Sequence, residues 1–149
     1  SVAKQLAATP VHLILSSPMQ RCRETAAPLA KALNLSPVIT PEVSEIPTPE
    51  NLTTDRVTWL KALMAGTWTQ APPLIQDWRQ ALVDKIKTLP DNTVVFSHFV
   101  AINAVVSALE GGDEAVIFRP TYCSQTLLLR ENGTLNVKRR GDEAATRVL

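Results

Sequence analysis

A short apolar run that ends in a polar turn constrains the fold of this chain more than any other feature. Val11 to Leu15 lies between Pro10 and a Ser-Ser-Pro sequence that begins at Ser16. An apolar run of this length with such boundaries predicts a buried strand of a parallel sheet. The following residues place apolar side chains on one helical face from Ala26 to Leu33. A buried strand that leads directly into a helix indicates an α/β fold.

The rest of the chain continues this alternation and then changes to a hairpin. Asn132 and Gly133 form the strongest short hairpin signal in the sequence, and the strand over 93–97 is so apolar that we place it at the centre of the sheet. Helical patterns also place Val57 and Leu74 on inward faces. The full set of expected elements is the end of a helix over 1–8, strands over 11–15, 37–40, 93–97, 125–130 and 134–139, and helices over 25–33, 50–65, 73–89 and 99–109. We predict one domain over 1–149, with three α/β/α layers and a mostly parallel mixed sheet.

Composition restricts the class of protein and of ligand. The net charge of +1 disfavours a broad nucleic-acid surface, and no apolar run approaches the roughly 20 residues that span a bilayer. Cys22 and Cys123 stand alone, outside any CxxC pair, which predicts reduced thiols and a cytoplasmic location. No group of residues has metal-ligand spacing, so no metal and no cofactor are expected.

Polar side chains suited to an anion follow two of the predicted strands. Arg21 lies about one turn into the helix after Ser16 and Ser17, so its guanidinium can return to the strand end and hold two phosphate oxygens. His98 stands where the strand over 93–97 stops, beside free N–H groups of the next helix. Because ligands of open α/β sheets bind beyond the carboxyl ends of strands, we predict that Arg21 and His98 form one phosphate site.

Each of these residues also has an ordinary structural interpretation. A single arginine in a helix usually faces solvent, and a histidine after a strand is more often structural than a ligand. Glu45 lies in a loop after the strand over 37–40, where it is placed either as a proton donor or as an exposed loop acid. An unrelated flavodoxin-like binding domain, in which Arg21 and His98 lie far apart, therefore stays open at this point.

Two segments carry a family resemblance that covers most of the chain. The sequence SSPMQRCRETAAPLA from Ser16 closely resembles the SSPLxRxxxTA segment of the histidine phosphatase superfamily, the phosphoglycerate-mutase-like proteins. The sequence VVFSHF from Val94 resembles a later strand of that family, which ends in Ser-His-Gly. The resemblance implies that Arg21 and His98 bind phosphate, and that Glu45 in VSEIPTP protonates the leaving group.

The departures from the family pattern are equally informative. The family's Arg-His-Gly signature, which carries the nucleophilic histidine and the first arginine, occurs nowhere in this sequence. The other histidine, His12, stands at the start of its strand, far from the predicted site, and is interpreted as structural or exposed. We therefore expect an N-terminally incomplete domain whose nucleophile and first central strand precede Ser1. Phe99 replaces the family's Gly after the second histidine, which predicts a narrower pocket or a shifted specificity.

The resemblance implies a phosphatase, a phosphoric monoester hydrolase that acts through a phosphohistidine. This chain alone is expected to be inactive, because it lacks the nucleophile and because Cys22 lies inside a helix rather than at the start of an anion-binding loop. The short segment after Glu45 favours a phosphatase over a mutase. The alternative is a non-catalytic phosphate-binding or phospho-ligand-binding module of the same fold. The expected partner is a small phosphorylated substrate or phosphate, without nucleic acid or membrane; the sequence leaves the oligomeric state open.

The missing strand also has a consequence for stability. Neighbouring strands would keep unpaired backbone groups, at a cost that exceeds the usual margin of roughly 5 to 15 kcal/mol. We expect the isolated chain to be unstable, or the gap to be filled by another piece of chain, a partner copy, or closure of the strand over 93–97 on the terminal hairpin.

Overall fold

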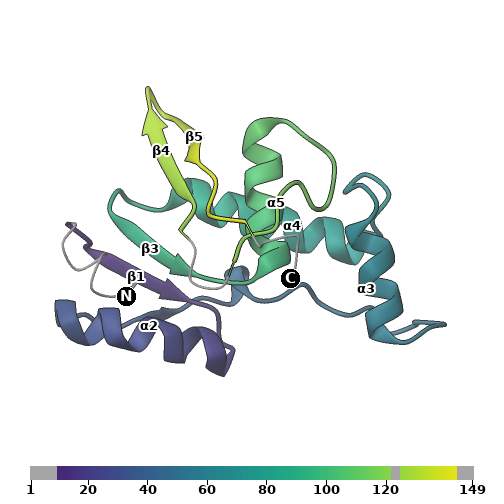
Figure 1. The fold of residues 1–149 in the computed structure, drawn as a ribbon, viewed down its shortest axis with the longest axis horizontal. Helices are drawn as coiled ribbons and strands as arrows, with labels where there is room; N and C mark the ends of the chain where they lie inside the picture. The colour runs from purple at the N-terminus through teal and green to yellow at the C-terminus, as the bar shows by residue number, and fades with distance from the viewer. Residues whose placement is uncertain (1–9, 122–124, 144–149) are drawn as a thin grey trace, which may run out of the picture.

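The parallel sheet is built from strands that are far apart in the sequence. The computed structural model describes residues 10–121 and 125–143; the helix expected over 1–8 and Cys123 lie outside these ranges. The strands β1 (Leu13–Ser16), β2 (Val38–Ile39) and β3 (Thr93–Phe96) form one sheet in the order β2-β1-β3 (Figure 1). Both pairings are parallel, with β1 between the other two strands.

The register of β1 and β3 brings their carboxyl ends side by side. Ser16 pairs with Phe96, and the N–H of Ser17 donates to the carbonyl of Phe96 at 2.9 Å. The residues that follow each strand, Ser17 and Ser97, therefore leave the sheet at the same edge. This edge is where an open parallel sheet binds ligands.

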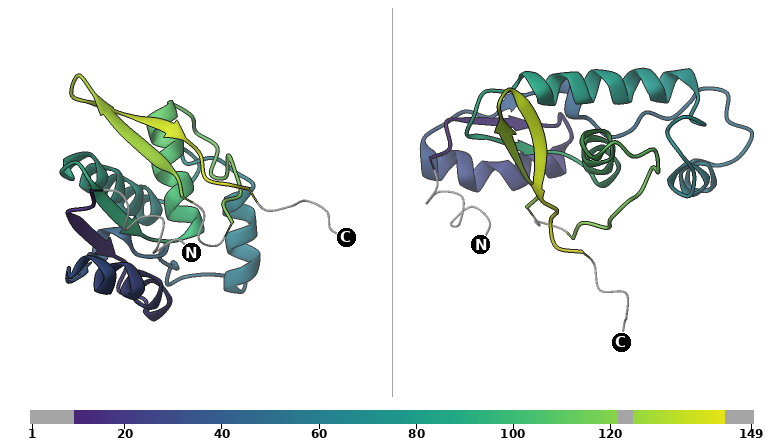
Figure 2. Two further views of the ribbon diagram at one scale, coloured as in Figure 1. Left: turned by 60° about the vertical axis from the view of Figure 1, so that its left-hand side comes forward. Right: turned by 90° about the horizontal axis from the view of Figure 1, so that it is seen from above.

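Helices cover both faces of the sheet. Helix α2 (Gln20–Leu33) packs Ala26 and Leu29 against Ile14, and it ends at Asn34, whose left-handed backbone forms the C-cap. Helix α4 (Pro73–Thr88) lies on the opposite face, so that the sheet is enclosed between the two helices (Figure 2). Helix α5 (Phe99–Glu110) packs against α4 and ends at Gly111, a glycine with positive φ.

The largest apolar cluster lies between α4, α5 and the connection after β2. It includes Trp68, Ile75, Leu82 and Ala104, each nearly inaccessible to solvent. The short 3-10 helix η1 (Pro41–Val43) contributes Val43 to the same cluster. The connection after β2 is therefore held by the core, although it contains little regular structure.

Three sequence predictions are wrong in detail. Helix α3 (Arg56–Met64) starts six residues after Glu50, because Asp55 caps it by accepting the N–H of Thr58 at 2.8 Å. Val57 and Leu74 are exposed, at 60% and 46%, since each lies near the start of its helix, before the face that meets the core. Strand β3 is an edge of the described sheet rather than its centre, and its apolar residues are half-buried.

The terminal hairpin forms a sheet of its own. Strands β4 (Leu127–Glu131) and β5 (Thr134–Arg139) pair antiparallel around Asn132 and Gly133, both with positive φ, as the sequence predicts. Within the described residues, β3 does not pair with this hairpin (Figure 1). The expected closure of β3 on the hairpin is therefore not formed.

The architecture confirms the predicted fold class. The described part of the chain is a mixed α/β structure with a parallel sheet of three strands and with four α-helices. None of the helices in the part of the chain that the structure describes is long and apolar enough to cross a membrane.

Candidate functional site

Arg21, Glu45 and His98 meet at the carboxyl edge of the sheet. The Arg21 Nη2 atom lies 3.1 Å from Glu45 Oε2 and 3.2 Å from His98 Nδ1. The three side chains come from α2, from the connection after β2 and from the N-cap of α5. The structure therefore brings together all three residues that the sequence selects, which disfavours the flavodoxin-like alternative.

Two hydrogen bonds hold the Glu45 connection against the rest of the fold. The hydroxyl of Ser97 donates to the carbonyl of Val43 at 2.7 Å, and the indole N–H of Trp78 donates to the carbonyl of Ser44 at 3.3 Å. Ile46, on the other side of Glu45, is buried in the core. The backbone on both sides of Glu45 is thus fixed, and its carboxylate is directed to Arg21.

The His98 ring is buried and fixed from behind by Ser17. His98 is 6% exposed, and its Nε2 lies 2.8 Å from the hydroxyl oxygen of Ser17, which also accepts the N–H of Met19 at 3.2 Å. Arg21 can only donate, so the neutral ring accepts with Nδ1 and carries its proton on Nε2, which donates to Ser17. Ser17 thereby leaves Nδ1 to the Arg21 guanidinium.

Opposing effects act on the protonation of His98. Burial lowers the pKa of His98 below its usual value, the Glu45 carboxylate acts to raise it, and the Arg21 guanidinium acts to lower it further. Burial dominates, so the ring favours its neutral form in the free protein. An anion beside Nδ1 would reverse this preference by stabilising the imidazolium.

A second arginine joins the site without having been predicted. Arg56, the first residue of α3, lies with Nη2 at 3.4 Å from Glu45 Oε1, and its Nε donates to Thr48 at 2.7 Å. Glu45 therefore lies between two guanidinium groups, and both arginines keep a substantial part of their side chains in solvent. The Pro-rich connection before Arg56 has no periodicity that could have located it.

Cys22 lies beneath the histidine ring rather than in the open part of the site. Its sulfur is 3.7 Å from His98 Nε2 and 3.5 Å from the carbonyl oxygen of Ser97. Burial raises the pKa of the Cys22 thiol, which disfavours the thiolate that a nucleophile requires. This position agrees with the expectation that Cys22 is not a nucleophile.

The remaining predicted residues lie elsewhere. His12 is exposed before β1, at the opposite end of the strand from the site. Over the described ranges, 10–121 and 125–143, no three His, Cys, Asp or Glu residues form a group that could hold a metal ion. The chemistry of the site is therefore that of two guanidinium groups, one imidazole and one carboxyl, a set suited to an oxyanion and a proton.

Several proteins whose solved structures have the same fold are phosphatases. The chain superposes on Bacillus stearothermophilus YhfR with a TM-score of 0.70 and 20% identity, covering 96% of this chain and 80% of that one. It superposes on the alpha-ribazole phosphatase from Shigella flexneri with a TM-score of 0.68 and 16% identity, covering 99% of this chain and 84% of that one. It superposes on the native mycobacterial glucosyl-3-phosphoglycerate phosphatase with a TM-score of 0.58 and 16% identity, covering 95% of this chain and 81% of that one. At these identities the likeness shows the fold alone.

A sequence comparison identifies the family. No protein with a curated description matches the chain. The profile of the histidine phosphatase superfamily (branch 1), however, matches residues 1–143, nearly the whole sequence. Because this match covers nearly the whole sequence, and the fold agrees with it, the chain belongs to branch 1 of the histidine phosphatase superfamily.

Proposed function

We propose that this chain forms the larger part of a phosphomonoesterase that acts through a phosphohistidine intermediate. The observation that carries the proposal is the contact of Arg21 with both His98 and Glu45, at 3.2 and 3.1 Å. A guanidinium and an imidazole that face the same space beside a carboxyl are the groups that a phosphomonoester needs for charge and for a proton. The phosphatases among proteins of the same fold support this reaction class.

Each residue has a distinct role in the proposed reaction. Arg21 exchanges its ion pair with Glu45 for two oxygens of the phosphoryl group, and His98 donates to a third oxygen from Nδ1. Glu45, released from Arg21 when the phosphomonoester binds and still beside Arg56, takes up a proton and then gives it to the leaving oxygen. Charge on the phosphoryl oxygens is thus balanced by groups that the fold already holds in place.

We propose that the nucleophile lies in a part of the protein outside this sequence. The family mechanism requires a histidine in line with the leaving group, and neither His12 nor His98 can supply it: His12 lies at the wrong end of β1, and His98 is turned toward Ser17 and Arg21. We propose that an Arg-His-Gly segment encoded before Ser1 supplies this histidine and a further arginine. The domain is then a single unit made of that segment and the present chain.

Turnover by two forms of the protein tests the proposal. The protein that includes the encoded upstream segment is expected to hydrolyse p-nitrophenyl phosphate and to form an acid-labile, base-stable phosphoenzyme on a histidine. The 149-residue chain is expected to show negligible turnover. Robust hydrolysis by the isolated chain, abolished in His98→Ala, would refute the assignment of the nucleophile.

The alternative is a non-catalytic module that binds a phosphorylated ligand with the same residues. It is favoured by the Arg21–Glu45 ion pair, in which the carboxylate of Glu45 already occupies the guanidinium that an anion would bind. Under this alternative, the longer protein binds inorganic phosphate through Arg21 and His98 but forms no phosphoenzyme. The same two measurements therefore separate the two functions.

A further inference from the structure

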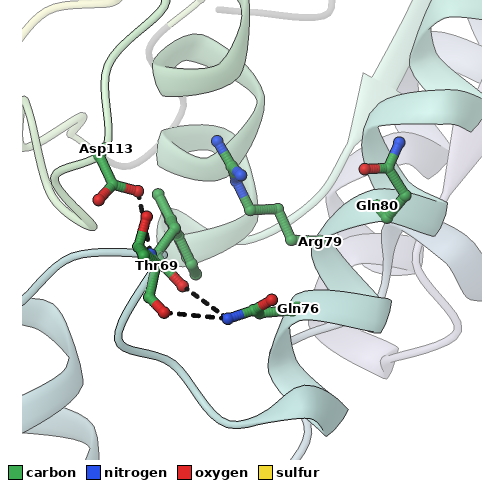
Figure 3. A pocket seen from close by; sticks show the side chains of 6 residues that line it. Thr69, Gln76, Arg79, Gln80 and Asp113 are labelled. Atoms are coloured by element: carbon green, nitrogen blue, oxygen red, sulfur yellow. Dashed lines mark hydrogen bonds between the residues drawn. The ribbon is translucent and has the colours of Figure 1, made fainter.

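The geometry points to a second ligand site, on the helical side of the molecule, for a small carboxylate that also carries a positively charged donor, such as an α-amino acid. The site is a pocket with a volume of about 200 Å³, lined by Trp68, Thr69, Gln76, Arg79, Gln80 and Asp113 (Figure 3). None of its lining residues belongs to the phosphate site. The inference is therefore independent of the proposed phosphatase activity.

Two buried donors in this pocket lack an acceptor. The indole Nε1 of Trp68, a residue that is 1% exposed, and the Nε of Arg79 are inaccessible to solvent and have no hydrogen-bond partner among the described residues. Buried N–H groups are almost always paired, because desolvation without a partner is costly. Both residues line the same pocket. The terminal guanidinium nitrogens of Arg79, unlike its Nε, are not among the buried atoms without a partner, so a carboxylate in the pocket can bind them.

The charge of Arg79 is also left without a direct counterion. Its guanidinium lies over the Trp68 ring, 5.4 Å from the centroid, and forms no ion pair within the described ranges. Burial lowers the pKa of Arg79, and the more distant Asp113 carboxylate only partly opposes this effect. A carboxylate bound to the guanidinium supplies the missing negative charge.

The pocket is held open by bonds that do not involve its free donors. The Gln76 amide donates to the carbonyl of Thr69 at 3.1 Å (Figure 3). It also donates to the carbonyl of Ala71 at 2.9 Å, and the two bonds fix the turn after Trp68. The N–H of Trp68 donates to the carbonyl of Asp113 at 2.7 Å, joining the two loops that form the wall. A site that is fixed before binding loses little conformational entropy when a ligand enters.

Asp113 sets the second requirement of the ligand. Its Oδ1 accepts the N–H of Thr69 at 3.0 Å, and this bond lowers the pKa of Asp113, so the carboxylate stays charged at the rim. Arg79 extends from α4 toward the side of the pocket where Asp113 lies (Figure 3). A ligand with only negative charge meets repulsion from Asp113, whereas a zwitterion places its carboxylate on Arg79 and its ammonium beside Asp113.

Indole N–H signals in NMR spectra provide a direct measurement. The chain has three tryptophans, and Trp68→Phe assigns the signal of interest without loss of an aromatic ring. Titration of the purified protein with glycine is expected to shift the Trp68 indole signal in a saturable way, with weaker binding of acetate and of inorganic phosphate. Arg79→Met is expected to weaken glycine binding at least about tenfold.

A matched arginine controls for general loss of charge. Arg140 also lies over an aromatic ring, that of Phe118 at 5.6 Å, but it is paired with Glu110, so Arg140→Met is expected to leave glycine binding unchanged. Asp113→Asn, which keeps an acceptor for Thr69, is expected to weaken glycine binding more than acetate binding. Absence of a saturable shift, equal affinity for acetate and glycine, or unchanged binding in a folded Arg79→Met variant would each overturn the inference.

Discussion

Arg21 and Arg79 occupy opposite situations in the same fold. The Arg21 side chain is 60% exposed but contacts two polar partners, Glu45 and His98. Arg79 is half-buried, yet its Nε has no acceptor among the described residues, and the guanidinium lies over an indole ring. At the first site an incoming anion must compete with Glu45 for the guanidinium. At the second site an anion can bind the Arg79 guanidinium without displacing a carboxylate of the protein.

The largest expected effect is on stability, and it distinguishes the packing of the Trp68 ring from the hydrogen bonding of its indole N–H. Trp68→Ala removes a fully buried ring and is expected to lower the free energy of unfolding by about 3–5 kcal/mol. Trp68→Phe keeps most of the ring and deletes an N–H that has no partner in residues 10–121 and 125–143, so its cost is expected to be far smaller. Urea denaturation of both variants measures the difference. Equal destabilisation by the two substitutions would mean that the indole N–H is satisfied in solution.

The next effect concerns the exposed arginine. Arg21→Met is expected to reduce sulfate affinity by at least about tenfold, because a hydrogen bond between charged groups contributes about 1.5–3 kcal/mol. Arg23, exposed on the same helix and outside the site, gives the control: Arg23→Met is expected to leave the affinity nearly unchanged. Calorimetric titration with sulfate measures both. Similar losses in the two variants would indicate general electrostatic attraction instead of a defined site.

A third prediction tests the support behind the histidine. Ser17→Ala leaves His98 Nε2–H and the Met19 N–H without their acceptor in a buried position, and is expected to cost about 1–3 kcal/mol of stability. In Ser17→Thr, which keeps the hydroxyl, the bond to His98 is expected to persist where the added methyl fits. The NMR titration of His98 reports its tautomer in each variant. An unchanged tautomer in Ser17→Ala would show that Arg21 alone orients the ring.

The smallest expected effect is a pH dependence of sulfate binding. Bound sulfate stabilises the imidazolium, so binding takes up a proton and affinity rises as pH falls from about 8 toward 5, by about fivefold for ~1 kcal/mol of charge interaction. The stability of the free protein has the opposite trend. The pKa of His98 lies below its unfolded value, so the unfolded chain binds more protons below about pH 6.5. The free energy of unfolding therefore decreases as the pH is lowered. Affinity that is equally pH-dependent in His98→Gln would exclude His98 as the source.

The position of the phosphate site could be predicted from the sequence, but its inner partners could not. Arg21 and His98 each follow a recognisable strand, and the carboxyl ends of parallel strands lie at one edge. The contact of Ser17 with His98 depends on the register between β1 and β3, which the sequence does not determine. Arg56 reaches Glu45 across a connection without periodicity.

The Arg79 pocket was missed for a related reason. Trp68 and Asp113 lie in irregular loops that are joined by backbone hydrogen bonds between distant segments. No local sequence pattern therefore predicts that the two residues lie together. Helical periodicity also failed for Val57 and Leu74, because a short helix can expose apolar residues in its first turn. Residues near strand ends were thus predictable, whereas contacts made by loops required the tertiary structure.

The pairing of β1 with β3 also sets the order in which the phosphate site can form during folding. Arg21 and His98 are separated by 77 positions in the sequence, while α2 and the β4–β5 hairpin are each made of local contacts. Closing so long a loop costs entropy before any contact between the two strands can repay it, so parallel pairing forms late. Affinity for an anion should therefore appear only in the last phase of refolding, after helical signal has recovered.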